Sequence, residues 1–162
     1  MGKKWLLSFA ITVVLGSCDK GRVYDEYESL STYWHRDSLV EFRFNAPDTL
    51  HKYDLFINLR NDSRYPFSNI FLITEMKFPH GKVISDTLQY EMAMPDGTWL
   101  GTGFGEIKES RLWYKENFRF PEVGTYQMTI QQALRRKDSV AGVQELPGIT
   151  EVGFRIEKNI KE

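Results

Sequence analysis

Cysteine is nearly absent from this sequence, because Cys18 is the only one in a chain of 162 residues. A single cysteine excludes an intramolecular disulfide, so the folded chain must depend on its hydrophobic core. Hydrophobic residues make up 41% of the chain and aromatic residues 14%. That content is sufficient for one core in a domain of this length.

A surplus of positive charge is also missing. The chain has 21 basic and 22 acidic residues, and removing Lys3 and Lys4 with an N-terminal signal leaves 19 basic residues. Proteins that bind nucleic acid need a basic surface, so this balance argues against that class. It also argues against electrostatic attachment to an anionic membrane surface. We therefore expect no nucleic-acid partner.

The sequence lacks the motifs of common catalytic and cofactor sites. Its three histidines, His35, His51 and His80, are scattered without the spacing of metal ligands, and no GxSxG motif is present. A Ser-His-Asp triad assembled from distant residues would leave no such motif and stays open. The glycines of residues 101–105 have the spacing GxGxG, which is not that of a phosphate-binding loop. We interpret residues 99–104 as a glycine-rich strand, and we expect no catalytic residue, metal or cofactor.

The apolar run near the N-terminus is too short to cross a bilayer as a helix. It covers residues 5–15, eleven residues, and follows Lys3 and Lys4. A spanning helix needs about 20 apolar residues, whereas a basic start and a short apolar segment are typical of an export signal. We predict that residues 1–17 are a signal peptide.

The sequence Leu15-Gly16-Ser17-Cys18 resembles the lipobox of bacterial lipoproteins. Leu15, Gly16 and Ser17 are the predicted signal-peptidase recognition residues, because small side chains let the peptidase reach the backbone. The thiol of Cys18 is the predicted lipid attachment site, and a second acylation, for example with palmitate, would follow at its new amino group. Two or more acyl chains anchor a protein stably, at about 0.8 kcal/mol per buried CH₂. The alternative is a buried, inert cysteine.

Beyond a short tether at residues 18–22, alternating apolar residues predict strands. The clearest segments are residues 39–44, 53–60, 68–78, 82–94, 111–120, 126–131 and 152–156. We interpret 53–78 as a central hairpin, with Ile57 facing the core and Asn58 facing away. Residues 23–30 are ambiguous, although an extended conformation is favoured. About eight strands in one domain, residues 23–160, predict an all-β antiparallel sandwich, with a jelly roll as one form of it.

Four aromatic residues are candidates for binding: Trp34, Trp99, Trp113 and Tyr114. Exposed aromatic side chains on a sandwich stack on sugar rings and are frequent hot spots of protein interfaces. Packing in the core is the other interpretation for each of them.

Several longer blocks resemble the gliding-motility lipoprotein family GldH. They are the lipobox at 15–18, VYDEY at 23–27, YDLFINLRND at 53–62, YPFSN at 65–69, DTLQYEMA at 86–93, PDGTWLG at 95–101, LWYK at 112–115 and GITEVGFRIEK at 148–158. Together they cover most of the chain that follows the predicted signal peptide.

The resemblance implies an outer-membrane lipoprotein, on the periplasmic face or at the cell surface. It also implies partners among other envelope lipoproteins and the proteins of the gliding and type IX secretion machinery, and it brings no catalytic residues. Members of the family also occur in bacteria that do not glide. Two classes of function stay open: a non-enzymatic component of a membrane assembly, and a lipid-anchored carbohydrate-binding module.

Overall fold

The computed structural model describes residues 21–160, and these residues contain ten strands and no helix. No segment among them is therefore a helix that could span a membrane. The strands are β1 (Arg22–Ser29), β2 (Tyr33–His35), β3 (Val40–Asn45), β4 (Tyr53–Asn61), β5 (Asn69–Lys77), β6 (Val83–Glu91), β7 (Lys108–Phe118), β8 (Thr125–Gln132), β9 (Glu145–Pro147) and β10 (Ile149–Lys158).

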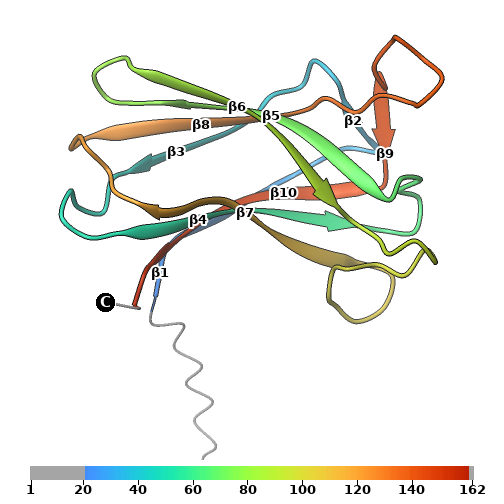
Figure 1. Cartoon of the computed structure of the whole chain (residues 1–162), viewed down its shortest axis with the longest axis horizontal. Helices are drawn as coiled ribbons and strands as arrows, with labels where there is room; N and C mark the ends of the chain where they lie inside the picture. The colour runs from blue at the N-terminus through green and yellow to red at the C-terminus, as the bar shows by residue number, and fades with distance from the viewer. Residues whose placement is uncertain (1–20, 161–162) are drawn as a thin grey trace, which may run out of the picture.

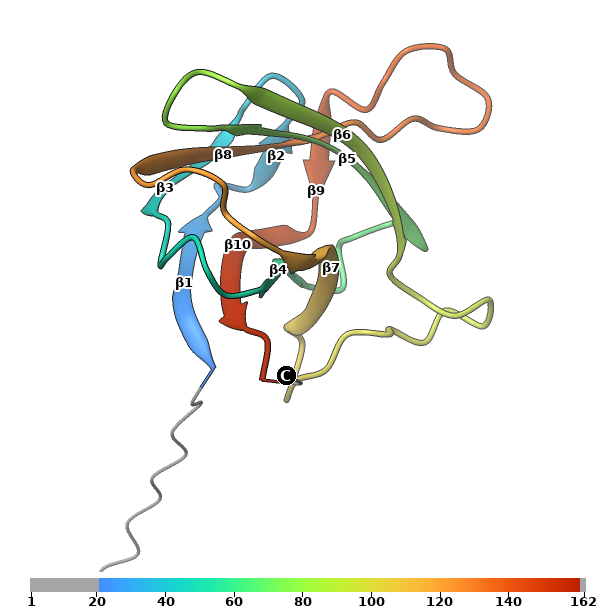
Figure 2. The same ribbon diagram turned by 60° about the vertical axis from the view of Figure 1, so that its left-hand side comes forward.

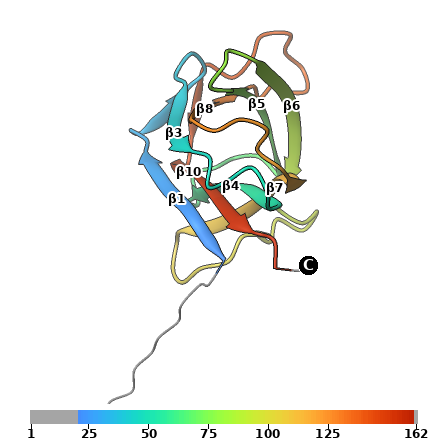
Figure 3. The same ribbon diagram turned by 90° about the vertical axis from the view of Figure 1, so that its left-hand side faces the viewer.

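Eight of the strands form two four-stranded sheets that pack face to face (Figures 1 and 3). Sheet I has the order β1-β10-β4-β7, and sheet II has the order β3-β8-β5-β6. All pairs are antiparallel. Counted without the short β2 and β9, successive strands lie in opposite sheets except β5 and β6, and the two strand orders are those of a jelly roll. The predicted all-β sandwich is confirmed.

The short strands β2 and β9 were not expected from the sequence. They pair with each other at one end of the sandwich, where β9 leads the chain into β10 (Figure 2). Trp34 and Leu146 lie opposite each other in this pair and are both fully buried. Segments of three residues are too short for alternation to reveal them.

The predicted hairpin over residues 53–78 is wrong. Its two strands exist, but β4 lies between β10 and β7 in sheet I, whereas β5 lies between β8 and β6 in sheet II. The connection at 62–68 crosses from one sheet to the other. The main-chain N–H of Tyr65 donates to the Asp62 carbonyl at 3.2 Å in a turn before Pro66. Each strand is rich in apolar residues and gains two neighbours in this arrangement, which a hairpin alone would not give it.

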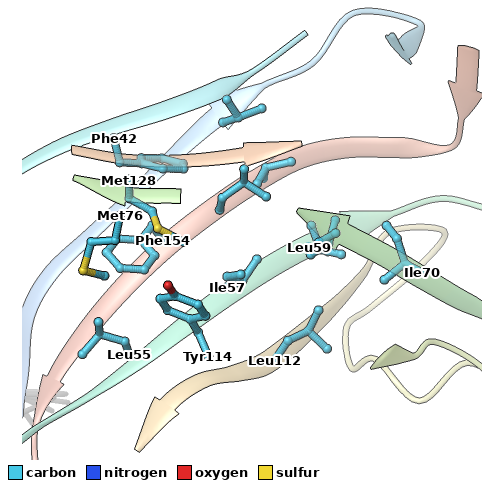
Figure 4. Close-up of a cluster of buried hydrophobic side chains, with 14 of the residues drawn as sticks. Phe42, Leu55, Ile57, Leu59, Ile70, Met76, Leu112, Tyr114, Met128 and Phe154 are labelled. Carbon is cyan, nitrogen blue, oxygen red and sulfur yellow. The ribbon is translucent and has the colours of Figure 1, made fainter. Parts of the chain in front are cut away.

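The core lies between the two sheets, and the predicted inner face of β4 is confirmed. Leu55, Ile57 and Leu59 are fully buried, and Ile70 and Met76 lie across the core from them on β5 of the opposing sheet (Figure 4). Leu72 of β5 is fully buried as well. A ring cluster fills one end, where Phe44 stacks on Tyr126 with 5.7 Å between the ring centroids.

The glycine-rich segment at residues 99–104 is a loop and not the predicted strand. Its main chain pairs through two isolated bridges, between Ala93 and Trp99 and between Thr102 and Glu109. Gly103 has φ of +149° and its main chain passes so close to Ile107 that a Cβ would lie 2.6 Å from the Ile107 carbonyl oxygen. Such a backbone suits a tight turn and excludes a regular ladder.

Candidate interaction surface

The outer face of sheet I carries a connected set of polar and aromatic side chains. Alternation along each strand points every second residue outward, and the register brings four of them into one row: Tyr27, Gly153, Asn58 and Arg111. A second row contains Asp25, Arg155, Phe56 and Trp113. We call the side of sheet I to which these rows and their neighbours point the outer face of sheet I.

Tyr27 lies flat across the middle of this face. Gly153 makes room for its ring, since a Cβ on Gly153 would come within 2.7 Å of a ring carbon of Tyr27. The Tyr27 hydroxyl accepts the Nδ2–H of Asn58 at 3.0 Å and donates to Oε2 of Glu109 at 3.1 Å. Burial, together with the nearby carboxylate of Glu109, raises the pKa of the Tyr27 phenol, so it stays a donor at neutral pH.

Asn58 faces away from the core as predicted, but it is buried on the outer side of β4. Only 2% of Asn58 and 3% of Phe56 is exposed, because Tyr27, Trp113 and Arg111 cover them. The strand is therefore buried on both faces near its middle.

Arg60 joins β4 to both of its neighbours. Its Nε donates to Glu109 Oε2 at 2.7 Å and its Nη1 donates to Glu151 Oε2 at 2.7 Å. These bonds raise the pKa of the Arg60 guanidinium, with Glu151 the larger cause. The guanidinium also lies 4.2 Å from the ring centroid of Tyr27, which is cation–π contact distance.

A second chain of charges runs across the face from β1 to β7. Arg155 donates from Nη1 to Asp25 at 3.0 Å and from Nε to Glu157 at 2.6 Å, and Glu157 also accepts from Arg111. Asp25 of β1 therefore pairs with a cation of β10. The charges on this face satisfy one another, so it offers directional hydrogen bonds and no strong field of one sign.

Trp113 borders a shallow hollow in the outer face. Trp113 is 53% exposed and packs on Phe56 with 4.4 Å between ring centroids. Asp54, Arg111 and Glu157 complete the lining of about 390 Å³. An exposed indole beside carboxylates and a guanidinium can hold a sugar ring or an aromatic side chain of another protein.

The four aromatic residues that are candidates for binding do not lie on one surface. Trp34 is fully buried and donates its Nε1–H to the Ser38 carbonyl at 3.0 Å. Tyr114 is 7% exposed and donates to Asp86 at 3.1 Å, and burial raises its pKa. Trp99 is partly buried near Tyr65, with ring centroids 6.1 Å apart. Only Trp113 is largely exposed among them.

Sequence reasoning missed most of the outer face. Alternation predicts the outward side for Asn58, but it does not connect this residue with Tyr27, Arg60, Glu109, Glu151 or Arg155. Alternation supplied the signal for the side of each strand, while the register between strands distant in sequence was needed to join them. The residues Leu15, Gly16, Ser17 and Cys18 lie outside the described residues. Within 21–160, no cluster of three or more histidine, cysteine or acidic residues has the geometry of a metal site.

These features define a class of protein: a single jelly-roll sandwich with a polar, aromatic outer face on one sheet. The chain belongs to the GldH lipoprotein family, whose family model matches residues 22–156. That match covers all of the eight strands of the two sheets except the last residues of β10.

Two curated relatives support the assignment. The chain is 61% identical over 152 residues to a gliding motility lipoprotein GldH homolog of Christiangramia forsetii, covering 93% of each chain. It is 51% identical over 146 residues to the gliding motility lipoprotein GldH of Flavobacterium johnsoniae, covering 90% of this chain and 91% of the relative. As a member of a lipoprotein family, the protein is associated with a membrane through a lipid anchor.

Among solved structures, the chain is similar to the infectious bursal disease virus VP2 subviral particle, with a TM-score of 0.44 and 13% identity. The similarity covers 86% of this chain and 33% of the viral chain. It is too weak to carry a conclusion.

Proposed function

We propose that this protein is a non-enzymatic component of an envelope assembly, held at the outer membrane by lipid on Cys18. Family membership over residues 22–156 is the observation that carries the proposal, since the two relatives are named as gliding motility lipoproteins. The lipobox at Leu15–Cys18 supplies the attachment point. Two acyl chains or more at that residue suffice for stable anchoring.

The tether between lipid and domain is short. Strand β1 begins at Arg22, and Gly21 already accepts the main-chain N–H of Lys158 at 2.7 Å. Three residues from Cys18 to Gly21 reach about 10 Å when extended. The folded domain therefore stays within reach of headgroups, and its partners are other envelope lipoproteins or the proteins of motility and type IX secretion.

The partner surface that we propose is the outer face of sheet I. It combines an exposed tryptophan, three guanidinium groups and carboxylates whose geometry is held by hydrogen bonds. Tryptophan and arginine are the residues most enriched at interface hot spots, and prior ordering lowers the entropy cost of binding.

The anchor is tested with Cys18→Ser in the full chain. We expect this protein to leave the outer-membrane fraction and to lack the mass of acyl chains, while its strand content stays unchanged. Ser17→Ala, which keeps a small residue before the cleavage site, is the matched control and should remain anchored. If Cys18→Ser stays in the outer-membrane fraction at the level of the parent chain and shows no loss of acyl mass, lipid attachment at this residue is refuted.

The partner surface is tested by cross-linking in intact cells followed by identification of the adducts. Trp113→Ala should remove specific envelope adducts without changing the amount of protein, because the indole is exposed. Phe104→Ala, at another exposed aromatic residue on the 99–107 loop, is the control. An unchanged adduct pattern in Trp113→Ala would locate the partner surface elsewhere.

A second candidate function, glycan binding, is favoured by the hollow beside Trp113 alone. Its indole is open on one side, and Asp54, Arg111 and Glu157 can bond to hydroxyl groups. Calorimetry of the lipidated protein with envelope oligosaccharides should show binding that Trp113→Ala abolishes. An absence of binding to any such glycan would leave the assembly role.

A further inference from the structure

Strand β6 is an edge of sheet II, and its free side can be assigned residue by residue. The main-chain N–H of Phe78 donates to the Lys82 carbonyl at 2.8 Å, and the N–H of Met92 donates to the Ser68 carbonyl at 2.6 Å. Even-numbered residues therefore exchange the hydrogen bonds between β5 and β6 at both ends of the pair. The side to which the main-chain N–H and C=O groups point alternates from residue to residue along a strand, and the β5–β6 pair has no bulge. The N–H and C=O groups of Ser85, Thr87 and Gln89 consequently point away from β5.

The free side of β6 has no neighbour within the described chain. Among residues 21–160, β5 is the only strand that pairs with it (Figure 3). It is nine residues long and contains neither proline nor a basic residue. Its outward side chains at Val83, Ser85, Thr87, Gln89 and Glu91 are all exposed.

The other three edges carry the devices that keep edge strands from pairing. Strand β3 has six residues and places Glu41 and Arg43 on its exposed side. Strand β1 is rich in charge and has an irregular register near Arg22. The pairing of β7 with β4 has two register shifts. In addition, the main-chain carbonyl of Trp113 in β7 accepts a hydrogen bond from the Tyr90 hydroxyl at 2.6 Å. Natural sheets protect their edges with charge, short length and bulges. Because β6 lacks the protection of the other three edges, it is the edge most open to pairing with another strand.

The one acidic side chain in the middle of β6 is neutralised within its own chain. Asp86 pairs with the Lys115 Nζ at 2.9 Å and accepts from the Tyr114 hydroxyl at 3.1 Å. Its carboxylate faces β7 and not the free edge. An approaching strand therefore meets no unpaired charge until Glu91, at the end of β6.

We propose that β6 pairs with β6 of a second copy of this chain, antiparallel about a two-fold axis through Thr87. This register sets Thr87 opposite Thr87, Ser85 opposite Gln89 and Val83 opposite Glu91. No like charges face each other, and pairs of hydroxyl and amide side chains are favourable across antiparallel strands. The contact is self-complementary, as a two-fold interface requires, and joins the two copies of sheet II into one continuous sheet.

The arrangement also agrees with anchoring of both copies to one bilayer, a point that rests on the proposed function. A two-fold axis between antiparallel strands is perpendicular to the sheet, so both copies of sheet I face the same side. Sheet I contains β1, and therefore the start of the described chain (Figure 1). A single strand pair buries less than the roughly 1,200 Å² of a stable interface, whereas a shared membrane raises the effective concentration.

Cysteine cross-linking in membranes of cells that make the full chain tests the register. Directly opposed residues have Cα atoms about 5.5 Å apart, which permits a disulfide. Thr87→Cys should thus form a covalent dimer under mild oxidation. Ser85→Cys should not, because two copies of Ser85 lie four residues apart along the strand, roughly 13 Å. Ser85→Cys and Gln89→Cys made together in one cell should cross-link to each other.

Two controls make the result decisive. Glu41→Cys, at the edge β3, should stay monomeric, and the parent chain should give no disulfide because lipid blocks Cys18. A disulfide in the parent chain would count against the proposed lipidation without bearing on β6. A monomeric Thr87→Cys protein that is still anchored would overturn the β6 pairing. Equal cross-linking of Thr87→Cys and Ser85→Cys would overturn it too, as would an adduct with a different protein.

A second pair of variants removes the contact without disturbing the fold. Thr87→Pro deletes an N–H that points away from β5, and proline is tolerated at the open side of an edge strand. We expect loss of the dimer detected by chemical cross-linking, while Thr87→Ala retains it. Thr87→Lys places two cations opposite each other across the two-fold axis, so this variant should also lose the dimer. If Thr87→Lys is anchored, folded and still dimeric, the two copies meet elsewhere and the proposal fails.

Discussion

At the scale of the residue, Ile57 and Asn58 are neighbours in β4 that face opposite sides of sheet I. Ile57 is fully buried between the sheets, so Ile57→Ala should lower the free energy of unfolding by about 2–5 kcal/mol. Asn58→Ala removes the bond to the Tyr27 hydroxyl, a loss of about 1 kcal/mol. The cost stays small because the buried Oδ1 of Asn58 has no hydrogen-bond partner to lose.

Chemical denaturation of both variants measures this difference. Equal midpoints would show that the inner and outer faces of β4 are assigned incorrectly. Against a total stability of about 5–15 kcal/mol, Ile57→Ala is also expected to reduce the amount of protein in the envelope.

Gly148 and Gly97 provide a second comparison at this scale. Both have positive φ, +86° and +88°, so an alanine at either position costs about 1–2 kcal/mol of backbone strain. A Cβ at Gly148 would also lie 2.1 Å from the main-chain nitrogen of Tyr65, whereas Gly97 has open space. We expect Gly148→Ala to be clearly the more destabilising in thermal unfolding. Similar melting temperatures would mean that the 62–68 connection does not pack against the bend before β10.

At the scale of the element, Tyr90 joins β6 to β7 across the open side of the sandwich. Its hydroxyl donates to the Trp113 carbonyl at 2.6 Å, and burial, helped by the charge of Asp86, raises the pKa of Tyr90 to about 12. The protonated phenol makes this bond, so its contribution is complete below the ordinary pKa of 10.0. The contribution is lost as the pH rises from there to about 12.

Urea unfolding of Tyr90→Phe across this alkaline range tests the link. The variant should be less stable than the parent chain at neutral pH, by about 1 kcal/mol, and the difference should shrink above pH 10. Tyr33→Phe, at an exposed tyrosine, should follow the parent chain at every pH. A difference that is constant through the alkaline range would show that the Tyr90 proton does not hold β6 to β7.

At the scale of the whole molecule, the sandwich should fold without its lipid. Each of the ten strands has side chains in the core or packed against it. Every pair of neighbouring strands in the described sheets lies within residues 21–160. A chain that begins at Lys20 should therefore give a strand-dominated circular-dichroism spectrum and one cooperative unfolding transition. A helix-dominated spectrum, or unfolding in separate steps, would contradict a single autonomous domain.

Local patterns in the sequence determined the fold class and the inward side of most strands. Alternation placed Val40, Phe42 and Phe44 on one side of β3, and all three are buried. The same pattern in β8 and β10 was confirmed, because the two-residue period of a strand is a property of its own backbone. The family resemblance likewise depended on local blocks of residues and is confirmed by the family match.

Only the tertiary structure decided which strands pair and what covers their outer sides. Alternation says which side of a strand is apolar, but it says nothing about its neighbours, so β4 and β5 looked like a hairpin until they were found in opposite sheets. The burial of Asn58 required Tyr27 from β1 and the small Gly153 from β10, which are distant in sequence. The register between such strands is set by the packing of the whole sandwich, and it is this register that builds the outer face of sheet I.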